Sequence, residues 1–378
     1  MGEYARLKEK RMEVTMGEYS KYIHDKRRAV ATPKDMVTDG KCVFGTFDKE
    51  FETMELLKIK HPTHAPDSFK RLKLTLWQAT EVHLDEGVLL AVVCDMGIFG
   101  LTLNVFYDKV AKKVYSWTTN LKSKNTIIAP NLINGSEAKA TTKNSHVHYV
   151  NNFQDGRCDL DGHADDGVNS IEYNFSLKRL SKPCVVSIPF APIEERHRPL
   201  YSQKDFFKAD GTLTFNGKTY HTTETSTAVV DDHRGYYPRR AHYDWVTTMG
   251  VNETNGMKKW FAFNLTRNQS IDQEQYNENL IWLENQTSLL PPVTFTRDVD
   301  TRKFVDGATW KINDEHGMVD VTFKVYDIFR MVTHAKPFVN IDYFVAFGEL
   351  EGYLLDEDGN KYVLDGMMGM GEDKTLLL

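Results

Sequence analysis

The sequence contains few cysteines, no long apolar run and no excess of basic residues. Lysine and arginine total 47 against 53 aspartate and glutamate residues, a formal net charge of −6. Nucleic-acid binding requires a basic surface or a concentrated basic stripe, so we expect no nucleic-acid partner. A membrane-spanning helix needs about 20 consecutive apolar residues. No run approaches that length, so we expect no membrane partner.

The four cysteines are widely spaced and form no Cys-x-x-Cys pair. Cys94 and Cys184 lie within apolar segments, where cysteine usually acts as a small buried hydrophobic residue. We interpret these two, together with Cys42 and Cys158, as reduced thiols. The N-terminal segment lacks the apolar core of a secretory signal peptide, so we expect a cytoplasmic protein.

Signatures of most cofactor-dependent enzymes are also absent. The sequence has no phosphate-binding P-loop, no Gly-x-Gly-x-x-Gly after a strand, no His-Glu-x-x-His and no Gly-x-Ser-x-Gly elbow. Each of these motifs places a cofactor, a metal or a nucleophile through a fixed local geometry. We therefore expect no cofactor.

What is present is a two-residue alternation of apolar and polar side chains that begins near Arg71 and continues almost to the C-terminus. Many short strands separated by turn residues are typical of sandwiches and barrels rather than of βαβ units. Helical periodicity is clearest in residues 1–30. We predict an all-β protein with an N-terminal helical arm at 1–40, a first barrel-like domain at 41–225 and a second at 226–378. The arm is expected to pack on the outside of its own chain or to form a homodimer contact.

The densest group of polar and aromatic residues is DDHRGYYPRRAHYDW, residues 231–245. Gly235 and Pro238 interrupt regular structure, which predicts one strand before them and another after them. The segment has two interpretations. It lines a ligand site, or it is a structural corner that closes one end of a barrel.

The second of these strands carries mixed faces. His242 and Asp244 share one face, whereas Tyr243 and Trp245 share the other, because side chains alternate along a strand. Each face therefore combines polar and bulky groups, as expected for a barrel interior that binds a ligand.

Two aspartates precede this strand. Arg234 could hold one of Asp231 and Asp232 ionised while apolar walls raise the pKa of the other. Which of them is the acid stays open, because neighbours in a strand face opposite sides. Further along the chain, Glu278 and Asn279 could present polar groups at a barrel mouth or form a turn before a strand.

A metal site is an alternative elsewhere in the chain. His146 and His148 share one face of a predicted strand, and Asp161 and His163 follow in GRCDLDGHADDG. Histidine and carboxylate groups are zinc ligands when they converge. The calcium-loop pattern fails, because Ala164 replaces the required glycine. An acidic surface loop explains the same residues, and we expect no metal.

The segment and its surroundings resemble the bacterial family of the domain of unknown function 2804. The resemblance rests on an ordered set of residues over about 40–375: Asp231, Arg234, Gly235, Pro238, Arg239, Trp245, Gly256, Asn264, Leu265, Glu278, Asn279, Trp310 and Asp320. It also includes KRLKLTLWQ near 70–78 and the terminal FGELEGYLLDEDGNKYVLDGMMGMGED.

That family in turn resembles the carotenoid 1,2-hydratase group, built from two lipocalin-like barrels in tandem. The Asp-His…Gly…Trp-x-Trp segment of that group is echoed by Asp232-His233, Gly235 and Tyr243-Asp244-Trp245, with tyrosine in place of the first tryptophan. The resemblance implies two consecutive lipocalin-like antiparallel β-barrels or sandwiches.

The resemblance also implies cofactor-free acid/base chemistry in a barrel interior, as in a hydratase, dehydratase, isomerase or related lyase. Asp231 or Asp232 would then be the acid and Arg234 would orient it. The remaining roles are substrate or water contacts by His242, Asp244, Glu278 and Asn279, and a pocket lining of Tyr236, Tyr243 and Trp245.

The substrate expected from these residues is a small polar, sugar-like molecule. A glycoside-cleaving enzyme, with two carboxylates across a pocket, is one alternative. A non-catalytic lipocalin-like carrier is a second, and a structural protein with side-chain-filled barrels is a third. The volume and polarity of the cavity distinguish these alternative functions.

Overall fold

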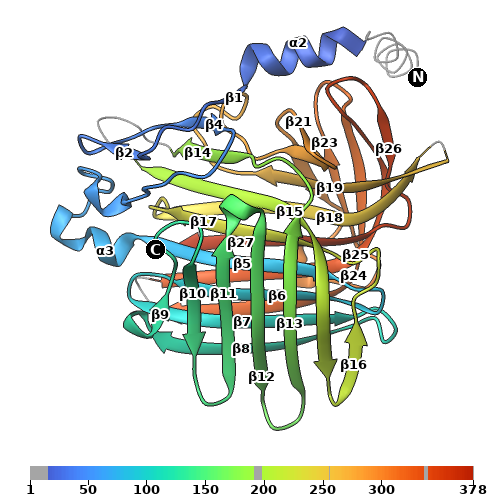
Figure 1. Ribbon diagram of the computed structural model, residues 1–378, viewed down its shortest axis with the longest axis horizontal. Coiled ribbons are helices and arrows are strands. Elements are labelled where there is room, and N and C mark those ends of the chain that lie inside the picture. The colour runs from blue at the N-terminus through green and yellow to red at the C-terminus, as the bar shows by residue number, and fades with distance from the viewer. Residues whose placement is uncertain (1–15, 191–197, 255, 336–338, 378) are drawn as a thin grey trace.

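The computed structural model describes residues 16–190, 198–254, 256–335 and 339–377. Nearly all of the described chain forms two antiparallel, barrel-like sheets, which confirms the predicted all-β tandem fold (Figure 1). The chain passes from the first sheet to the second at residues 236–239. The first part of the expected helical arm, residues 1–15, lies outside the described residues.

The first sheet is a nearly closed barrel, within the described residues, of fifteen strands. Its strands are β1 (Ala29–Val30), β4 (Gly45–Phe47), β5 (Thr75–His83), β6 (Gly87–Asp95), β7 (Phe99–Asp108), β8 (Lys113–Lys122), β9 (Thr126–Ile127), β10 (Ser136–Thr141), β11 (Ser145–Asn152), β12 (Arg157–Asp165), β13 (Ser170–Arg179), β14 (Val185–Pro189), β15 (Pro199–Phe215), β16 (Lys218–His221) and β17 (Thr227–Gly235). The main order is β8-β7-β6-β5-β17-β15-β13-β12-β11-β10-β9. The sheet curls so that β9, β10 and β11 approach β6.

The second sheet is an open half-barrel of ten strands among the described residues. Its strands are β18 (Arg240–Thr254), β19 (Met257–Arg267), β20 (Leu280–Leu283), β21 (Gln286–Leu289), β22 (Thr294–Arg297), β23 (Thr309–Asn313), β24 (Val319–Ala335), β25 (Val339–Leu355), β26 (Lys361–Val363) and β27 (Met368–Leu377). The order is β21-β20-β19-β18-β27-β25-β24-β23-β22, so the first and last strands pair at its centre.

Small elements surround the two sheets. They are the helices α2 (Met16–Lys26) and α3 (Lys70–Lys73), the ribbon β2 (Val37–Thr38) with β3 (Lys41–Cys42), and the 3-10 turns η2 (Leu56–Lys58), η3 (Asp67–Phe69), η4 (Ser123–Asn125), η5 (Phe153–Asp155) and η6 (Thr301–Lys303). No helix among the described residues is long and apolar enough to cross a membrane. All four cysteines are buried and free.

Helix α2 packs against the second sheet of its own chain, at the upper edge of Figure 1. Tyr19 and Ile23 are buried in the apolar cluster that fills the second half-barrel. The guanidinium of Arg27 donates to the carbonyl of Asn279 over 2.6 Å. The helix therefore buries its apolar side chains within this chain, whereas a homodimer contact through it stays a prediction.

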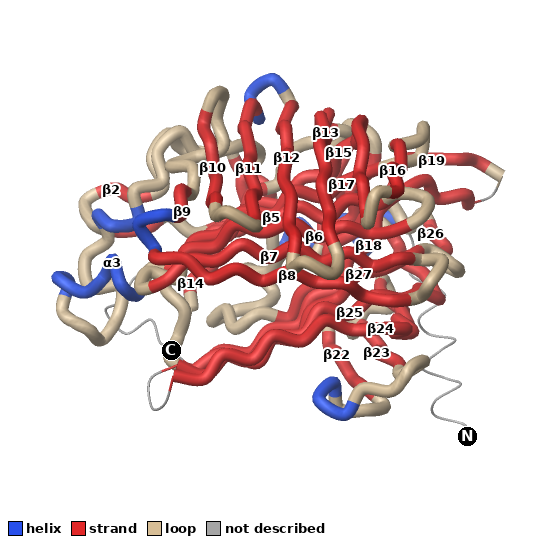
Figure 2. The backbone as a smooth tube through the Cα atoms, turned by 90° about the horizontal axis from the view of Figure 1, so that it is seen from below, coloured by secondary structure: helices blue, strands red, loops and turns tan. Residues whose placement is uncertain are grey.

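Burial patterns show where the two sheets meet. In β12 and β13 buried and exposed residues alternate, because the barrel interior lies on one face and solvent on the other. In β6 and β17 every residue is buried, because their outer faces pack on the second sheet. Figure 2 shows β24, β25 and β27 passing beneath the strands of the first sheet. The rings of Tyr107 and Phe347 stack across this interface at 5.3 Å.

Candidate functional site

A pocket lies between the two sheets rather than inside either barrel. Its volume is about 460 Å³, including the space open to solvent at its mouth. The ionisable side chains that line it include Lys204, Asp231, His233, Glu278 and Glu372, and the aromatic ones include Trp77, Tyr237, Tyr243 and Trp245. An adjoining pocket of about 540 Å³ shares Trp77, Asp231, Tyr243 and Glu372 as walls.

Strand alternation explains why these side chains reach the pocket. Asp231 and His233 are two residues apart on β17 and share the face that meets the second sheet. Their direct cross-strand partners on β15 are Lys204 and Ser202. The four side chains therefore form a two-by-two patch on the outer wall of the first barrel. The ring of Trp77, the partner of His233 on β5, stacks on the imidazole at 4.8 Å.

Lys204 is the centre of this patch. Its Nζ lies 2.6 Å from Glu278 Oε2, 3.0 Å from His233 Nε2 and 3.8 Å from Asp231 Oδ1. The hydroxyl of Ser202 donates to Glu278 Oε2 over 2.7 Å. The ammonium on β15 thus contacts three side chains, two from β17 and one from the loop before β20.

Charge pairing keeps this patch ionised despite its burial. Burial alone would lower the pKa of Lys204, but the carboxylates of Asp231 and Glu278 raise it above its usual value. Burial alone would raise the pKa of Glu278, but Lys204 and His233 hold it well below its usual range. The buried pair is therefore an ammonium and a carboxylate near neutral pH.

Glu372 enters the pocket from the opposite wall, on β27. Burial raises the pKa of Glu372 to about 7, although Lys374 and a hydrogen bond from Tyr343 oppose the shift. The phenol of Tyr343 donates to Glu372 Oε1. Burial likewise lowers the pKa of Lys374, against the attraction of Glu372. A carboxyl group that titrates near neutrality can both donate and accept a proton at physiological pH.

Aromatic rings enclose the charged groups of this second wall. Lys374 Nζ lies 4.9 Å from the ring centre of Trp77, 4.8 Å from that of Tyr343 and 5.5 Å from that of Tyr243. These are cation–π distances, which stabilise the ammonium where water is scarce. Burial raises the pKa of Tyr243 and Tyr343 well above the usual value, so both phenols stay protonated.

Three buried polar atoms of the pocket have no hydrogen-bond partner in the described part of the chain. They are Asp231 Oδ1, His233 Nδ1 and Tyr237 Oη. Buried polar atoms are almost always paired, since an unpaired one costs about 1–3 kcal/mol. Their convergence on one pocket indicates a position for water or for a polar ligand.

The structure separates the two predicted aspartates. Asp232 and Arg234 lie on the opposite face of β17 from Asp231 and point into the first barrel. Arg234 Nε and Nη2 donate to the two oxygens of Asp232 over 2.6 and 2.8 Å. Both are nearly inaccessible to solvent, and neither lines the pocket. They form a bidentate ion pair, so each buried charge has a partner inside the barrel.

His242 and Asp244 belong to another network, on the face of β18 that points into the second half-barrel. Arg297 Nη2 lies 2.6 Å from Asp244 Oδ1, and His242 Nε2 lies 3.0 Å from Asp373 Oδ1. Hydrogen bonds to Asp244 and Asp373 raise the pKa of His242 to about 9. This network closes the end of the half-barrel, and His242 also borders the mouth of the pocket.

Of the other predicted residues, some line the pocket and some lie outside it. Tyr243, Trp245 and Glu278 line the pocket. Tyr236 is buried beneath the N-terminal segment, where its hydroxyl donates to the carbonyl of Leu56 over 3.2 Å. Asn279 accepts from the backbone of Thr266 and donates to that of Pro291, over 2.6 and 2.8 Å. Its amide group is therefore engaged in holding the loop.

Sequence reasoning missed residues on both walls of the pocket. They include Trp77, Lys204 and His233 on the first sheet, Tyr237 on the connection between the sheets, and Tyr343, Glu372 and Lys374 on the second sheet. A signal was available in the charged residues of otherwise apolar strands, such as Lys204 in PLYSQKDFF and Glu372 in MGMGEDKTLL. A charge inside a buried strand is expensive unless it is paired or functional.

Two clusters in the described chain bring metal-type donors together: His146 with His148 and Asp161, and His242 with Asp244 and Asp373. Neither is centred on the pocket. In the second, Arg267 and Arg297 bind Asp244, so guanidinium groups already supply the positive charge that a cation would bring.

A known structure shows the same fold, and a second one is similar more remotely. A crystal structure of a candidate AttH protein from Nitrosomonas europaea matches with 13% identity and a TM-score of 0.51, over 82% of this chain and 93% of that one. Kievitone hydratase from Nectria haematococca matches with 10% identity and a TM-score of 0.41, over 80% and 88%. No curated protein sequence matches the chain. At these identities the first likeness shows the fold alone.

A family model describes nearly the whole chain. Its match begins within the segment that follows helix α2 and ends within β27, so it includes both sheets and both walls of the pocket. The chain therefore belongs to the family of the domain of unknown function DUF2804, whose model matches residues 27–376.

Proposed function

We propose that the pocket between the sheets is the active site of an acid/base enzyme of the hydratase, dehydratase or isomerase class. Its substrate is a small polar organic molecule, and the catalytic groups belong to the chain itself. The observation that carries the proposal is the presence of two carboxyl groups on facing walls of the same pocket. Glu372 titrates near neutrality, and Asp231 has an oxygen without a hydrogen-bond partner among the described residues.

Glu372 acts as the general acid. With a pKa of about 7 it is substantially protonated at neutral pH, and the hydrogen bond from Tyr343 to Oε1 orients it. In the dehydration direction the acid proton passes to a leaving hydroxyl group, which departs as water. In hydration, the reverse reaction, the Glu372 carboxylate takes a proton from the attacking water while the protonated Asp231 gives its proton to the carbon of the double bond. Proton transfer by a positioned group typically contributes about 10²–10⁴-fold to the rate.

Asp231 acts as the general base. Its Oδ1 accepts no hydrogen bond within the described residues, which leaves a lone pair to take a proton from a carbon acid. The same oxygen lies 3.8 Å from Lys204 Nζ and 3.3 Å from His233 Nε2, and these contacts hold the carboxylate in place. Two carboxyl groups with different environments in one site are a recurrent acid/base arrangement.

The remaining walls support a small substrate with polar groups. Trp77, Tyr243 and Trp245 supply flat apolar surfaces, on which an unsaturated or ring-shaped molecule can stack. His233 Nδ1 and Tyr237 Oη, which have no hydrogen-bond partner in the described part of the chain, are available to its polar atoms. An apolar lining with a few convergent polar groups is typical of small-molecule sites.

The test incubates the protein with a library of hydroxylated and unsaturated metabolites in D₂O and follows the products by mass spectrometry. A hydratase or dehydratase changes the mass by one water molecule, and an isomerase incorporates deuterium. Glu372→Gln is expected to lose about 10²–10⁴-fold in rate while still binding the substrate. Glu351→Gln, an exposed glutamate on β25 of the same sheet, is the matched control and is expected to retain the wild-type rate.

A non-catalytic carrier gives a different result. Ligands would then raise the melting temperature of the wild type and of Glu372→Gln equally, and none would be turned over. That outcome would overturn the proposed enzyme activity.

A further inference from the structure

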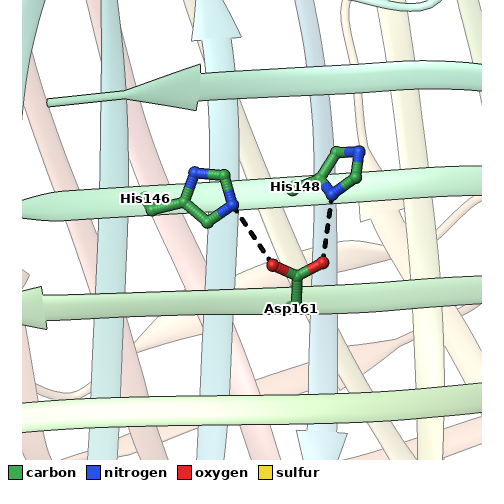
Figure 3. Close-up of side chains that lie close together, drawn as sticks. All are labelled: His146, His148 and Asp161. Atoms are coloured by element: carbon green, nitrogen blue, oxygen red, sulfur yellow. Dashed lines mark hydrogen bonds and ion pairs between the residues drawn. The ribbon is translucent and has the colours of Figure 1, made fainter.

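A second group of chemically active side chains lies on the outer wall of the first barrel, away from the pocket. His146 and His148 are two residues apart on β11 and project from the same face of the sheet (Figure 3). On the neighbouring strand β12, Asp161 is the direct partner of His148, and His163 is the direct partner of His146. Antiparallel pairing thus places three imidazoles and a carboxylate on four adjacent positions.

The distances in this group match those between ligands of one metal ion. Asp161 Oδ2 lies 3.2 Å from His146 Nε2, and Asp161 Oδ1 lies 3.0 Å from His148 Nδ1 (Figure 3). His146, His148 and Asp161 offer ligand atoms that all lie within 4.8 Å of one another. Ligand atoms at about 2.0–2.1 Å from a tetrahedral zinc ion are about 3.3 Å apart. Small side-chain adjustments therefore suffice to surround an ion.

The second nitrogen of His146 also has a partner, since Nδ1 lies 2.7 Å from the hydroxyl of Thr141. His148 Nε2 makes no hydrogen bond within the described residues, and the carboxylate of Glu137 lies 3.7 Å from it. Metal-bound histidines characteristically use the non-ligating nitrogen for such a contact, which fixes the tautomer and the ring orientation. Nε2 of His146 and Nδ1 of His148 are left for the ion, and these are the nitrogens that face Asp161.

From this geometry we propose that His146, His148 and Asp161 bind one divalent transition-metal ion, with Zn²⁺ as the preferred occupant. Two imidazoles select against Ca²⁺ and Mg²⁺, which prefer oxygen ligands. The histidine side chains are 22% exposed and that of Asp161 is 44% exposed, which leaves a fourth position for water or for His163.

The site is independent of the proposed active site, since the two lie on different walls of the barrel and share no residue. Its function would be to tie β11 to β12 or to hold a metal-bound water at the surface.

The test is a calorimetric titration of the full-length, chelator-treated and desalted protein with zinc chloride. The wild type is expected to bind one Zn²⁺ per chain and to gain thermal stability. His148→Ala and Asp161→Asn are expected to bind at least about tenfold more weakly, since each removes one of three ligands. Thr141→Val, which keeps the ligands but removes the partner of His146, is expected to weaken binding about tenfold.

His221→Ala, at an exposed histidine on β16, is the matched control and is expected to bind as the wild type does. All of these positions lie outside the apolar core, and circular dichroism checks that each variant is folded. The proposal is overturned if the wild type shows no saturable binding, or if His148→Ala and Asp161→Asn bind Zn²⁺ as tightly as His221→Ala.

Discussion

Glu372 allows a quantitative prediction, because its pKa is raised from 4.5 to about 7 by burial. A tenfold change in proton affinity corresponds to about 1.4 kcal/mol, so the full shift corresponds to about 3 kcal/mol. Glu372 is only 7% exposed, so solvent screens little of the free-energy cost of ionising it. We expect Glu372→Gln to be more stable than the wild type at alkaline pH by about that amount.

The sign follows from proton linkage. A carboxyl group with a higher pKa in the folded than in the unfolded chain binds more protons in the folded state between the two values. Stability therefore falls as the pH rises from about 4.5 to about 7, and the penalty is complete above that range. Glutamine is neutral at every pH and keeps an oxygen to accept the hydrogen bond from Tyr343, so it removes the penalty without removing that bond.

The assay is urea unfolding followed by tryptophan fluorescence at about pH 5 and about pH 8.5. The variant is expected to exceed the wild type by about 3 kcal/mol at the higher pH and by about 1 kcal/mol or less at the lower. Glu351→Gln controls for the loss of one negative charge and is expected to show no such pH-dependent difference. A stability difference that is the same at both pH values would refute the argument that buried ionisation at Glu372 is its source.

Two further predictions concern the charged networks. Lys204→Met leaves Glu278 buried without its cation and is expected to cost about 3–5 kcal/mol of unfolding free energy. Lys208→Met breaks a surface pair with the exposed Glu224 and should cost at most about 1 kcal/mol. Similar losses for the two variants in urea unfolding would contradict the assignment of Lys204 and Glu278 as a buried ion pair. His242 has a pKa raised from 6.5 to about 9 by hydrogen bonds to two aspartates, so its stabilising effect is complete below about pH 6.5 and is lost as the pH rises through about 9. His242→Gln should therefore lower the melting temperature more at about pH 6 than at about pH 10, and equal losses would count against an imidazolium in this network.

Several features of the fold followed from local chemistry. The two-residue alternation predicted the strands, since a half-buried strand must place apolar residues on one side. Gly235 and Pro238 predicted the break between β17 and β18, where the chain changes sheets. The same alternation placed Asp231 and Asp232 on opposite faces, as it placed His242 opposite Tyr243.

The sequence by itself determined which residues share a face, because the side-chain period of a strand is a property of the backbone. It could not determine which face is the pocket, because that depends on which other strand packs against it. The packing of the two sheets made the Asp231 face of β17 and the Tyr243 face of β18 an interface. It left Asp232 inside the first barrel and Asp244 buried on the other face of β18. Glu372 also reached the pocket through strand pairing, because β27 pairs with β18 and places Glu372 directly beside Trp245. That pairing joins residues far apart in the chain, and only the tertiary structure decided it.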